Sequence, residues 1–155
     1  MTDLALPTHP LTPAQLNPSG IADALDRAAH LIHTNGLATG EYWECQLFAT
    51  RWTEGRGCDA LGAIGVAVGY RDHLDIDRAI VGEDVYDPKA HAYATTGPHP
   101  VLAALMAHLG VRDPLDVMNW SDKAQDRAVV EALRACAAGL RIHAAAAEQV
   151  GRVAS

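Results

Sequence analysis

Apolar residues recur at helical spacing in two long stretches of the chain. The spaced residues of the first stretch are Ile21, Leu25, Ala28 and Ile32. They predict an amphipathic helix whose start is capped by Ser19. We expect this helix to end at Asn35-Gly36, because glycine readily adopts the left-handed conformation of a helix terminus.

The second stretch predicts the longest helix of the chain. Its spaced apolar residues are Val130, Leu133, Ala137 and Leu140. Asp122 and Gln125 have the spacing of a capping box, so the helix is expected to follow Asn119-Trp120-Ser121-Asp122 directly. Gly139 predicts an end or a bend, and the alanine-rich segment from residue 143 continues the helix until it frays near Gly151.

Shorter patterns predict the remaining elements. Thr12 and Gln15 have capping-box spacing around a brief helical turn. Residues 58–69 predict a helix of about three turns, and residues 101–109 predict a short helix that ends before Gly110. Asp113-Pro114 starts another short turn. Residues 37–57 favour either a short hairpin or an ordered loop, and residues 71–97 an acidic excursion with one helical turn.

Together these elements predict a mainly α, single-domain helical bundle of about five helices, with an irregular loop or short hairpin insertion. Residues 1–18 are expected to form an N-terminal arm with a short helical turn, residues 19–150 the helical domain, and residues 151–155 a frayed tail. The length of 155 residues suits one domain.

Composition narrows the function classes. The formal net charge is −7 and no run of Lys or Arg occurs, which argues against a nucleic-acid partner. No window has the ~18 consecutive apolar residues of a membrane span. The first residues do not resemble a secretory signal, and three cysteines without a CxxC pair argue against a disulfide framework, so we expect a cytoplasmic protein.

One stretch, GCDALGAIGVAVGY at residues 57–70, carries three glycines within a predicted helix. At 100° per residue, Cys58, Gly62, Gly65 and Gly69 share a sector of about 60°. Each interior glycine costs about 1 kcal/mol relative to alanine, so something must approach this stripe closely. A neighbouring helix backbone is the main expectation. The alternative is a ligand cavity that Gly62 and Gly65 would line. The spacing fits no phosphate-binding loop.

Cys58 supplies a catalytic hypothesis. A thiol at a helix N-terminus has a lowered pKa and can act as a nucleophile. His99 or His108 would then serve as the base, and Asp122 or Asn119 would orient it. This arrangement predicts a hydrolase or a transferase.

His30 and His33 supply a metal hypothesis. Their i, i+3 spacing on the first helix brings two imidazoles toward one side, and Glu44 or Cys45 could complete a site. The alternative is that both histidines occupy the last helical turn, where positive charge is favoured. Asp72, Asp75 and Asp77 lack the glycine and glutamate of a calcium loop.

Aromatic residues supply a binding hypothesis. Tyr42, Trp43 and Trp52 lie in the predicted loop, where aromatic side chains either pack into the core or line a ligand pocket or a partner surface. Trp120 is expected to pack the last helix onto the core.

Several motifs in order resemble a family of small, uncharacterised domains, largely from actinobacteria and phages. The motifs are ADALDRAAHLIHTNG, a glycine-containing aromatic loop, a cysteine before Leu-Gly-Ala-Ile, and Trp-Ser-Asp leading to Arg127 and VVEAL. Ser121 replaces the asparagine typical of that family, and Cys58 lies one residue further from Gly62 than is expected for the family. The resemblance covers roughly residues 21–138. It implies a single helical domain and assigns no catalytic residue.

The function we expect from the sequence is therefore a cytoplasmic binding or regulatory domain. Its aromatic loop around Trp43 and Trp52 would engage a protein partner or a small ligand, without a cofactor. A symmetric homodimer is a further expectation. The alternatives are the Cys58-dependent enzyme and the metal site at His30 and His33.

Overall fold

A computed structural model describes residues 4–47, 49–83, 85–94 and 96–154 of the chain. Its α-helices and strands are α1 (Pro18–Asn35), α2 (Ala60–Ala67), α3 (His73–Asp75), β1 (Val85–Asp87), β2 (Ala92–Ala94), α4 (Pro100–Leu109), α5 (Pro114–Lys123) and α6 (Asp126–Ala154). A 3-10 turn, η1 (Pro13–Gln15), precedes α1, and a π-helical turn, η2 (Ile76–Val81), follows α3. The expected mainly α fold is confirmed.

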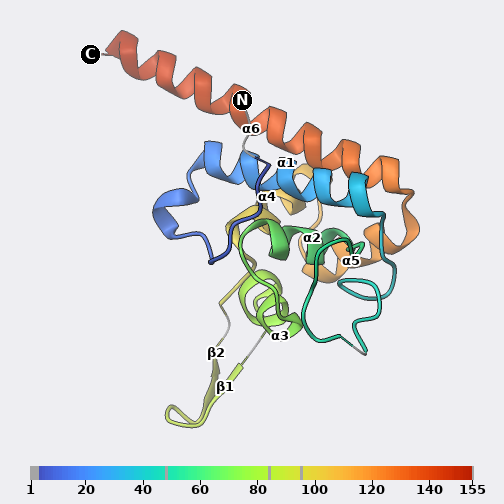
Figure 1. Ribbon diagram of the computed structural model, residues 1–155. Coiled ribbons are helices and arrows are strands. Elements are labelled where there is room, and N and C mark those ends of the chain that lie inside the picture. The colour runs from blue at the N-terminus through green and yellow to red at the C-terminus, as the bar shows by residue number, and fades with distance from the viewer. Residues whose placement is uncertain (1–3, 48, 84, 95, 155) are drawn as a thin grey trace.

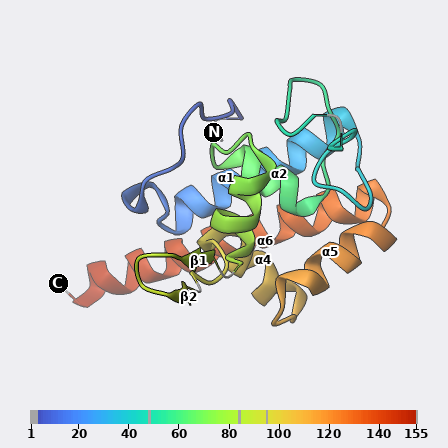
Figure 2. The same cartoon turned by 90° about the horizontal axis from the view of Figure 1, so that it is seen from below.

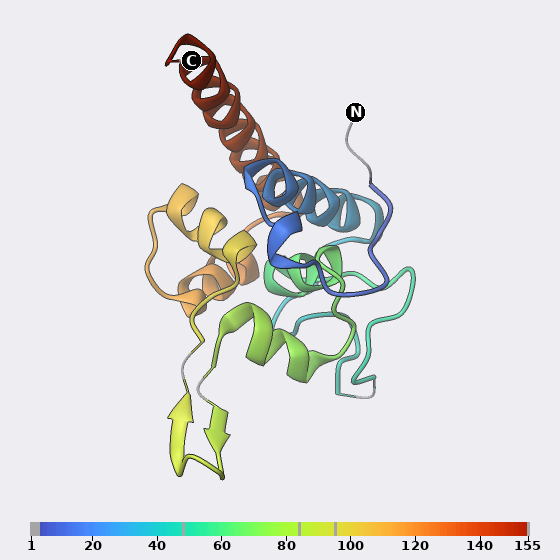
Figure 3. The same cartoon turned by 90° about the vertical axis from the view of Figure 1, so that its left-hand side faces the viewer.

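The two longest helices, α1 and α6, run side by side in opposite directions (Figure 1). In α6 the predicted residues Val130, Leu133 and Ala137 are buried, because their spacing places them on the face toward α1. Helix α6 has 29 residues against 18 in α1, so its C-terminal part extends beyond the rest of the fold (Figure 3). Gly139 lies inside α6 and does not end it.

Helix α2 lies at the centre, and all eight of its residues are buried. It contacts α1, α4, α5 and η2, and Figure 2, which looks from below, shows η2 in front of it. Asp59 caps its start by accepting a hydrogen bond from the Gly62 amide. The helix is shorter than predicted, since it begins at Ala60 and leaves Cys58 in the preceding loop.

The first irregular region follows one of the two alternatives that the sequence left open, and the second differs from the expectation. Residues 37–47 and 49–57 form an ordered loop tied down by single bridges, among them Trp43 to Cys58. The hairpin lies instead within residues 71–97, where β1 and β2 pair antiparallel with Tyr86 opposite Tyr93, and it projects from the body (Figure 3). The same region carries α3 and η2 in place of one helical turn.

Three further predicted helix boundaries were wrong. Asn17, rather than Ser19, caps α1 by accepting a hydrogen bond from the Gly20 amide at 2.8 Å. Helix α5 continues through Trp120 to Lys123, so Asp122 lies inside it and α6 begins at Asp126.

Within the described ranges, none of the helices has the length and apolar character needed to cross a bilayer.

Arg141 of α6 donates hydrogen bonds to two carboxylates of α1, to Asp23 at 2.7 Å and to Asp26 at 2.6 Å. Arg141→Ala is expected to lower the free energy of unfolding by about 1 kcal/mol, because two partly buried charge-assisted bonds are lost. Urea denaturation measures the change. Arg127→Ala is the matched control: its pair with Glu131 is exposed and lies within α6, so its effect should be within error. Equal effects would contradict a role in holding α6 to α1.

Candidate functional site

The glycine stripe of α2 is filled by protein atoms. A Cβ atom on Gly62 would overlap the carbonyl oxygen of Tyr42, and one on Gly65 would overlap the side chain of Ile76. At Gly69, where φ is +109°, a Cβ would overlap the backbone of His9. The expected close approach is thus made by a loop, a side chain and the N-terminal arm, not by a helix backbone.

Cys58, His99 and Asp122, three residues of the catalytic hypothesis, each have a separate structural environment. Cys58 is fully buried, and burial together with the nearby Asp59 and Glu44 carboxylates raises the pKa of its thiol well above the usual range. His99 caps α4 by accepting a hydrogen bond at Nδ1 from the Val101 amide, and burial lowers its pKa. Asp122 accepts a hydrogen bond from the Gly40 amide.

The remaining members of that hypothesis are exposed, with His108 in the last turn of α4 and Asn119 in α5. Across the described residues, no hydrogen bond joins the Cys58 thiol to any of these histidines, asparagines or aspartates. The structure therefore shows neither a thiolate-stabilising environment nor an assembled triad around Cys58.

The two histidines of the metal hypothesis line different hollows. His30 faces a cavity beside the N-terminal arm, while His33 lines a groove with Asp126 and Arg127. In the part of the chain that the structure describes, no group of three or more His, Cys, Asp or Glu side chains is placed to hold a metal ion. Among the described residues, neither Glu44 nor Cys45 nor another side chain therefore completes a metal site with His30 and His33.

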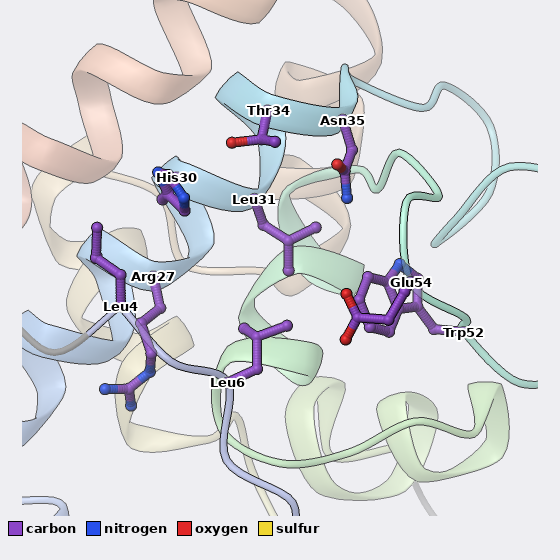
Figure 4. A pocket seen from close by; sticks show the side chains of 9 residues that line it. All are labelled: Leu4, Leu6, Arg27, His30, Leu31, Thr34, Asn35, Trp52 and Glu54. Atoms are coloured by element: carbon purple, nitrogen blue, oxygen red, sulfur yellow. The ribbon is translucent and has the colours of Figure 1, made fainter.

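A cavity of about 330 Å³ lies between the N-terminal arm, α1 and the loop that carries Trp52. We call it the arm cavity. Its apolar lining comes from Leu4, Leu6, Leu31 and Trp52. Its polar lining comes from Arg27, His30, Thr34, Asn35 and Glu54. Figure 4 shows these side chains, with Leu31 and Leu6 across the middle, Arg27 and His30 at one end, and Glu54 and Asn35 at the other.

Trp52 forms a firm wall of the arm cavity. Its indole N–H donates to the Arg56 carbonyl at 2.9 Å, and the Arg71 guanidinium lies over its ring, 5.5 Å from the centroid. The ring is 5% exposed. Because its one hydrogen-bond donor is already used, Trp52 offers a bound molecule only an apolar and aromatic surface.

Trp43 and Tyr42 have structural contacts instead. Trp43 is completely buried, and its indole N–H donates to the Ala49 carbonyl at 2.9 Å. The Tyr42 hydroxyl donates to the Asp77 carboxylate and so ties the loop to η2. Burial and this hydrogen bond raise the pKa of Tyr42 beyond its usual range. Of the aromatic residues predicted to bind a ligand, only Trp52 faces the arm cavity.

Two arginines that the sequence analysis did not single out hold the walls of the arm cavity together. Arg27 is 9% exposed and donates from Nε to the Ala67 carbonyl at the end of α2. Arg71 donates to the Val66 carbonyl at 2.9 Å and to the Pro7 carbonyl of the arm at 2.7 Å. A sequence signal existed for Arg27, since it adjoins the apolar stripe of α1 beside Ala28.

A third residue that the sequence analysis did not single out is Asp59. It is fully buried and caps α2 through Oδ1, while Oδ2 has no hydrogen-bond partner within the described chain. Burial is the main cause that raises its pKa to about 7, and the nearby Asp122 and Glu41 carboxylates add to the shift. The Asp-x-x-Gly spacing before an apolar helix was the available signal.

Comparison with known proteins identifies the family of this chain. A model described as a family of unknown function, DUF6197, matches residues 17–139. The chain belongs to this family. No match was found among curated proteins or among solved structures. The resemblance expected from the sequence is confirmed at the level of a family without an assigned activity.

The DUF6197 match extends from the cap of α1 into the middle of α6. It therefore includes the lining residues of the arm cavity from Arg27 to Glu54, whereas Leu4 and Leu6 lie outside it. The outer wall of the cavity in this DUF6197 protein is thus built from a segment that precedes the matched region.

Proposed function

We propose that the protein is a binding domain for a small amphipathic molecule that occupies the arm cavity, and that it acts in the cytoplasm. The observation that carries this proposal is the mixed lining: three leucines and an indole, together with hydroxyl, amide, imidazole, guanidinium and carboxylate groups. A concave, preformed site in which polar groups adjoin apolar walls suits a small molecule that has both a polar and an apolar part.

The volume and the supports of the cavity favour a small ligand over a protein partner. A volume of about 330 Å³ lies at the lower end of the range for small-molecule sites. Trp52 and Arg71 are fixed by hydrogen bonds to backbone carbonyls, so the walls are formed before binding. Preorganised walls reduce the ordering cost of binding a small molecule.

The test is to block the cavity from an exposed position. Thr34→Trp places an indole at the rim in the last turn of α1 without changing the core. We expect aromatic fragments to shift the indole N–H signal of Trp52 in ¹H–¹⁵N spectra, and Thr34→Trp to abolish these shifts. His33→Trp is the matched control, because the neighbouring His33 lines the other groove. The proposal is wrong if no fragment perturbs Trp52, or if the blocked and control variants bind equally.

A further inference from the structure

Building on the proposed function, we infer that the ligand of the arm cavity is an amphipathic amine, with its apolar body between the leucines and Trp52 and its ammonium group beside Glu54. The first observation is the direction of the charged side chains. In Figure 4 the Glu54 carboxylate points toward the middle of the cavity, near Leu6 and Leu31, whereas the Arg27 guanidinium turns away at the opposite end.

The two charges differ in their existing contacts. Arg27 is buried and its Nε donates to the Ala67 carbonyl, so its charge stabilises the C-terminus of α2. Glu54 is exposed, and in the described part of the chain it forms no salt bridge; Arg71 interacts with it only at longer range. The carboxylate is therefore the lining charge that is available to a ligand.

The end of α1 adds to the same preference. Thr34 and Asn35 are the last two residues of α1 and line the cavity, with Asn35 toward the Glu54 end (Figure 4). The C-terminus of a helix carries the negative end of its dipole and favours cations within the last turn. The Glu54 carboxylate and the C-terminus of α1 thus both provide negative potential where the polar part of a ligand would lie, next to the apolar walls.

The lining also disfavours the opposite ligand class. A carboxylate placed at this end would face Glu54 and the α1 terminus, and the like charges would disfavour its binding. His30 and Arg27 lie at the far end, beyond Leu31 and Leu6 (Figure 4). A small molecule with one charged group and one apolar group is therefore recognised by the sign of that charge.

Three matched probes test the inference: 2-phenylethylamine, 3-phenylpropionate and 2-phenylethanol, which share an aromatic ring and differ in the charge of the polar group. We expect the amine to bind most tightly by calorimetry and to shift the Trp52 indole signal. Glu54→Gln should weaken the amine about three- to tenfold, because a charge-assisted hydrogen bond becomes a neutral one, and should leave the alcohol unchanged. Glu83→Gln, which makes the same change of net charge outside the cavity, is the control.

The outcomes separate this inference from the proposed function. If the carboxylate binds as tightly as the amine, or if Glu54→Gln and Glu83→Gln weaken the amine equally, the inferred ligand class is overturned while the cavity remains a binding site. If none of the three probes perturbs Trp52 and the fragment screen also fails, the proposed function falls and the inference falls with it.

Discussion

Gly62→Ala is expected to lower the free energy of unfolding by about 3 kcal/mol or more, because the added methyl group has no space in the folded protein. Its Cβ would overlap the carbonyl oxygen of Tyr42 and crowd the adjoining backbone carbon. Backbone cannot move aside as the end of a flexible side chain can. The clash therefore outweighs the gain of about 1 kcal/mol that alanine gives over glycine inside a helix.

The same substitution also disturbs two hydrogen bonds at the start of α2. The Tyr42 carbonyl accepts from the Asp59 amide at 3.0 Å, and the Asp59 carboxylate accepts from the Gly62 amide at 2.7 Å. Moving the loop away from Gly62 lengthens the first bond and strains the second. Trp43, next to the displaced Tyr42, is fully buried, so the shift would extend into the core.

Gly139→Ala is the matched control for Gly62→Ala. Gly139 lies inside α6, and a Cβ there meets no atom within 4 Å. Alanine should therefore stabilise the protein by about 0.5 to 1 kcal/mol through helix propensity alone. Urea denaturation of both variants measures the two effects. A Gly62→Ala protein as stable as the Gly139→Ala protein would show that the Tyr42 loop does not pack on α2.

The long helices could be predicted from the sequence because their signals are local. The apolar stripe of α1 and the Asn35-Gly36 end lie within one continuous segment, and the same holds for the buried face of α6 and for α4 with its Gly110 terminus. The end of α5 could not be predicted in this way. Ser121 is a polar residue on its buried face, and it is compensated by accepting a hydrogen bond from the Ala60 amide, 61 residues away.

The candidate site was predictable only in part, for the same reason. Trp52 was singled out as a ligand-binding residue and His30 as a metal ligand, but no local pattern places both in one cavity. The cavity needs Leu6 from the arm, and the arm is held by Arg71 through the Pro7 carbonyl, a contact between residues 64 positions apart. Such contacts follow from the packing of whole elements, not from the spacing of residues along one helix.

Asp59→Asn is expected to abolish a large pH dependence of stability. The pKa of Asp59 is raised from 3.8 to about 7 in the folded protein, mainly because the carboxyl is buried. The folded state therefore holds this proton more tightly than the unfolded state. The stability that proton binding provides is fully present below about pH 4, is lost as the pH rises toward 7, and stays lost above that, at a total of about 4 kcal/mol at most.

The geometry explains why the charged form is so unfavourable. Oδ1 accepts a hydrogen bond from the Gly62 amide, but Oδ2 has no partner among the described residues, and the neighbouring Asp122 and Glu41 carry the same charge. An ionised Asp59 leaves a buried, uncompensated charge at the joint between α2, α5 and the Tyr42 loop. Asparagine keeps the helix cap and cannot ionise.

The measurement is urea denaturation of both proteins between pH 5 and pH 9. Relative to Asp59→Asn, the wild type should lose stability between pH 5 and about pH 7 and show little further relative loss above that, because Asp59 titrates in the wild type alone. His99, whose pKa is lowered by burial, destabilises the fold only as the pH falls, and its contribution is common to both proteins and cancels in the difference. Parallel curves for the two proteins would contradict a buried, protonated Asp59 and would mean that the carboxylate finds a compensating partner when it ionises.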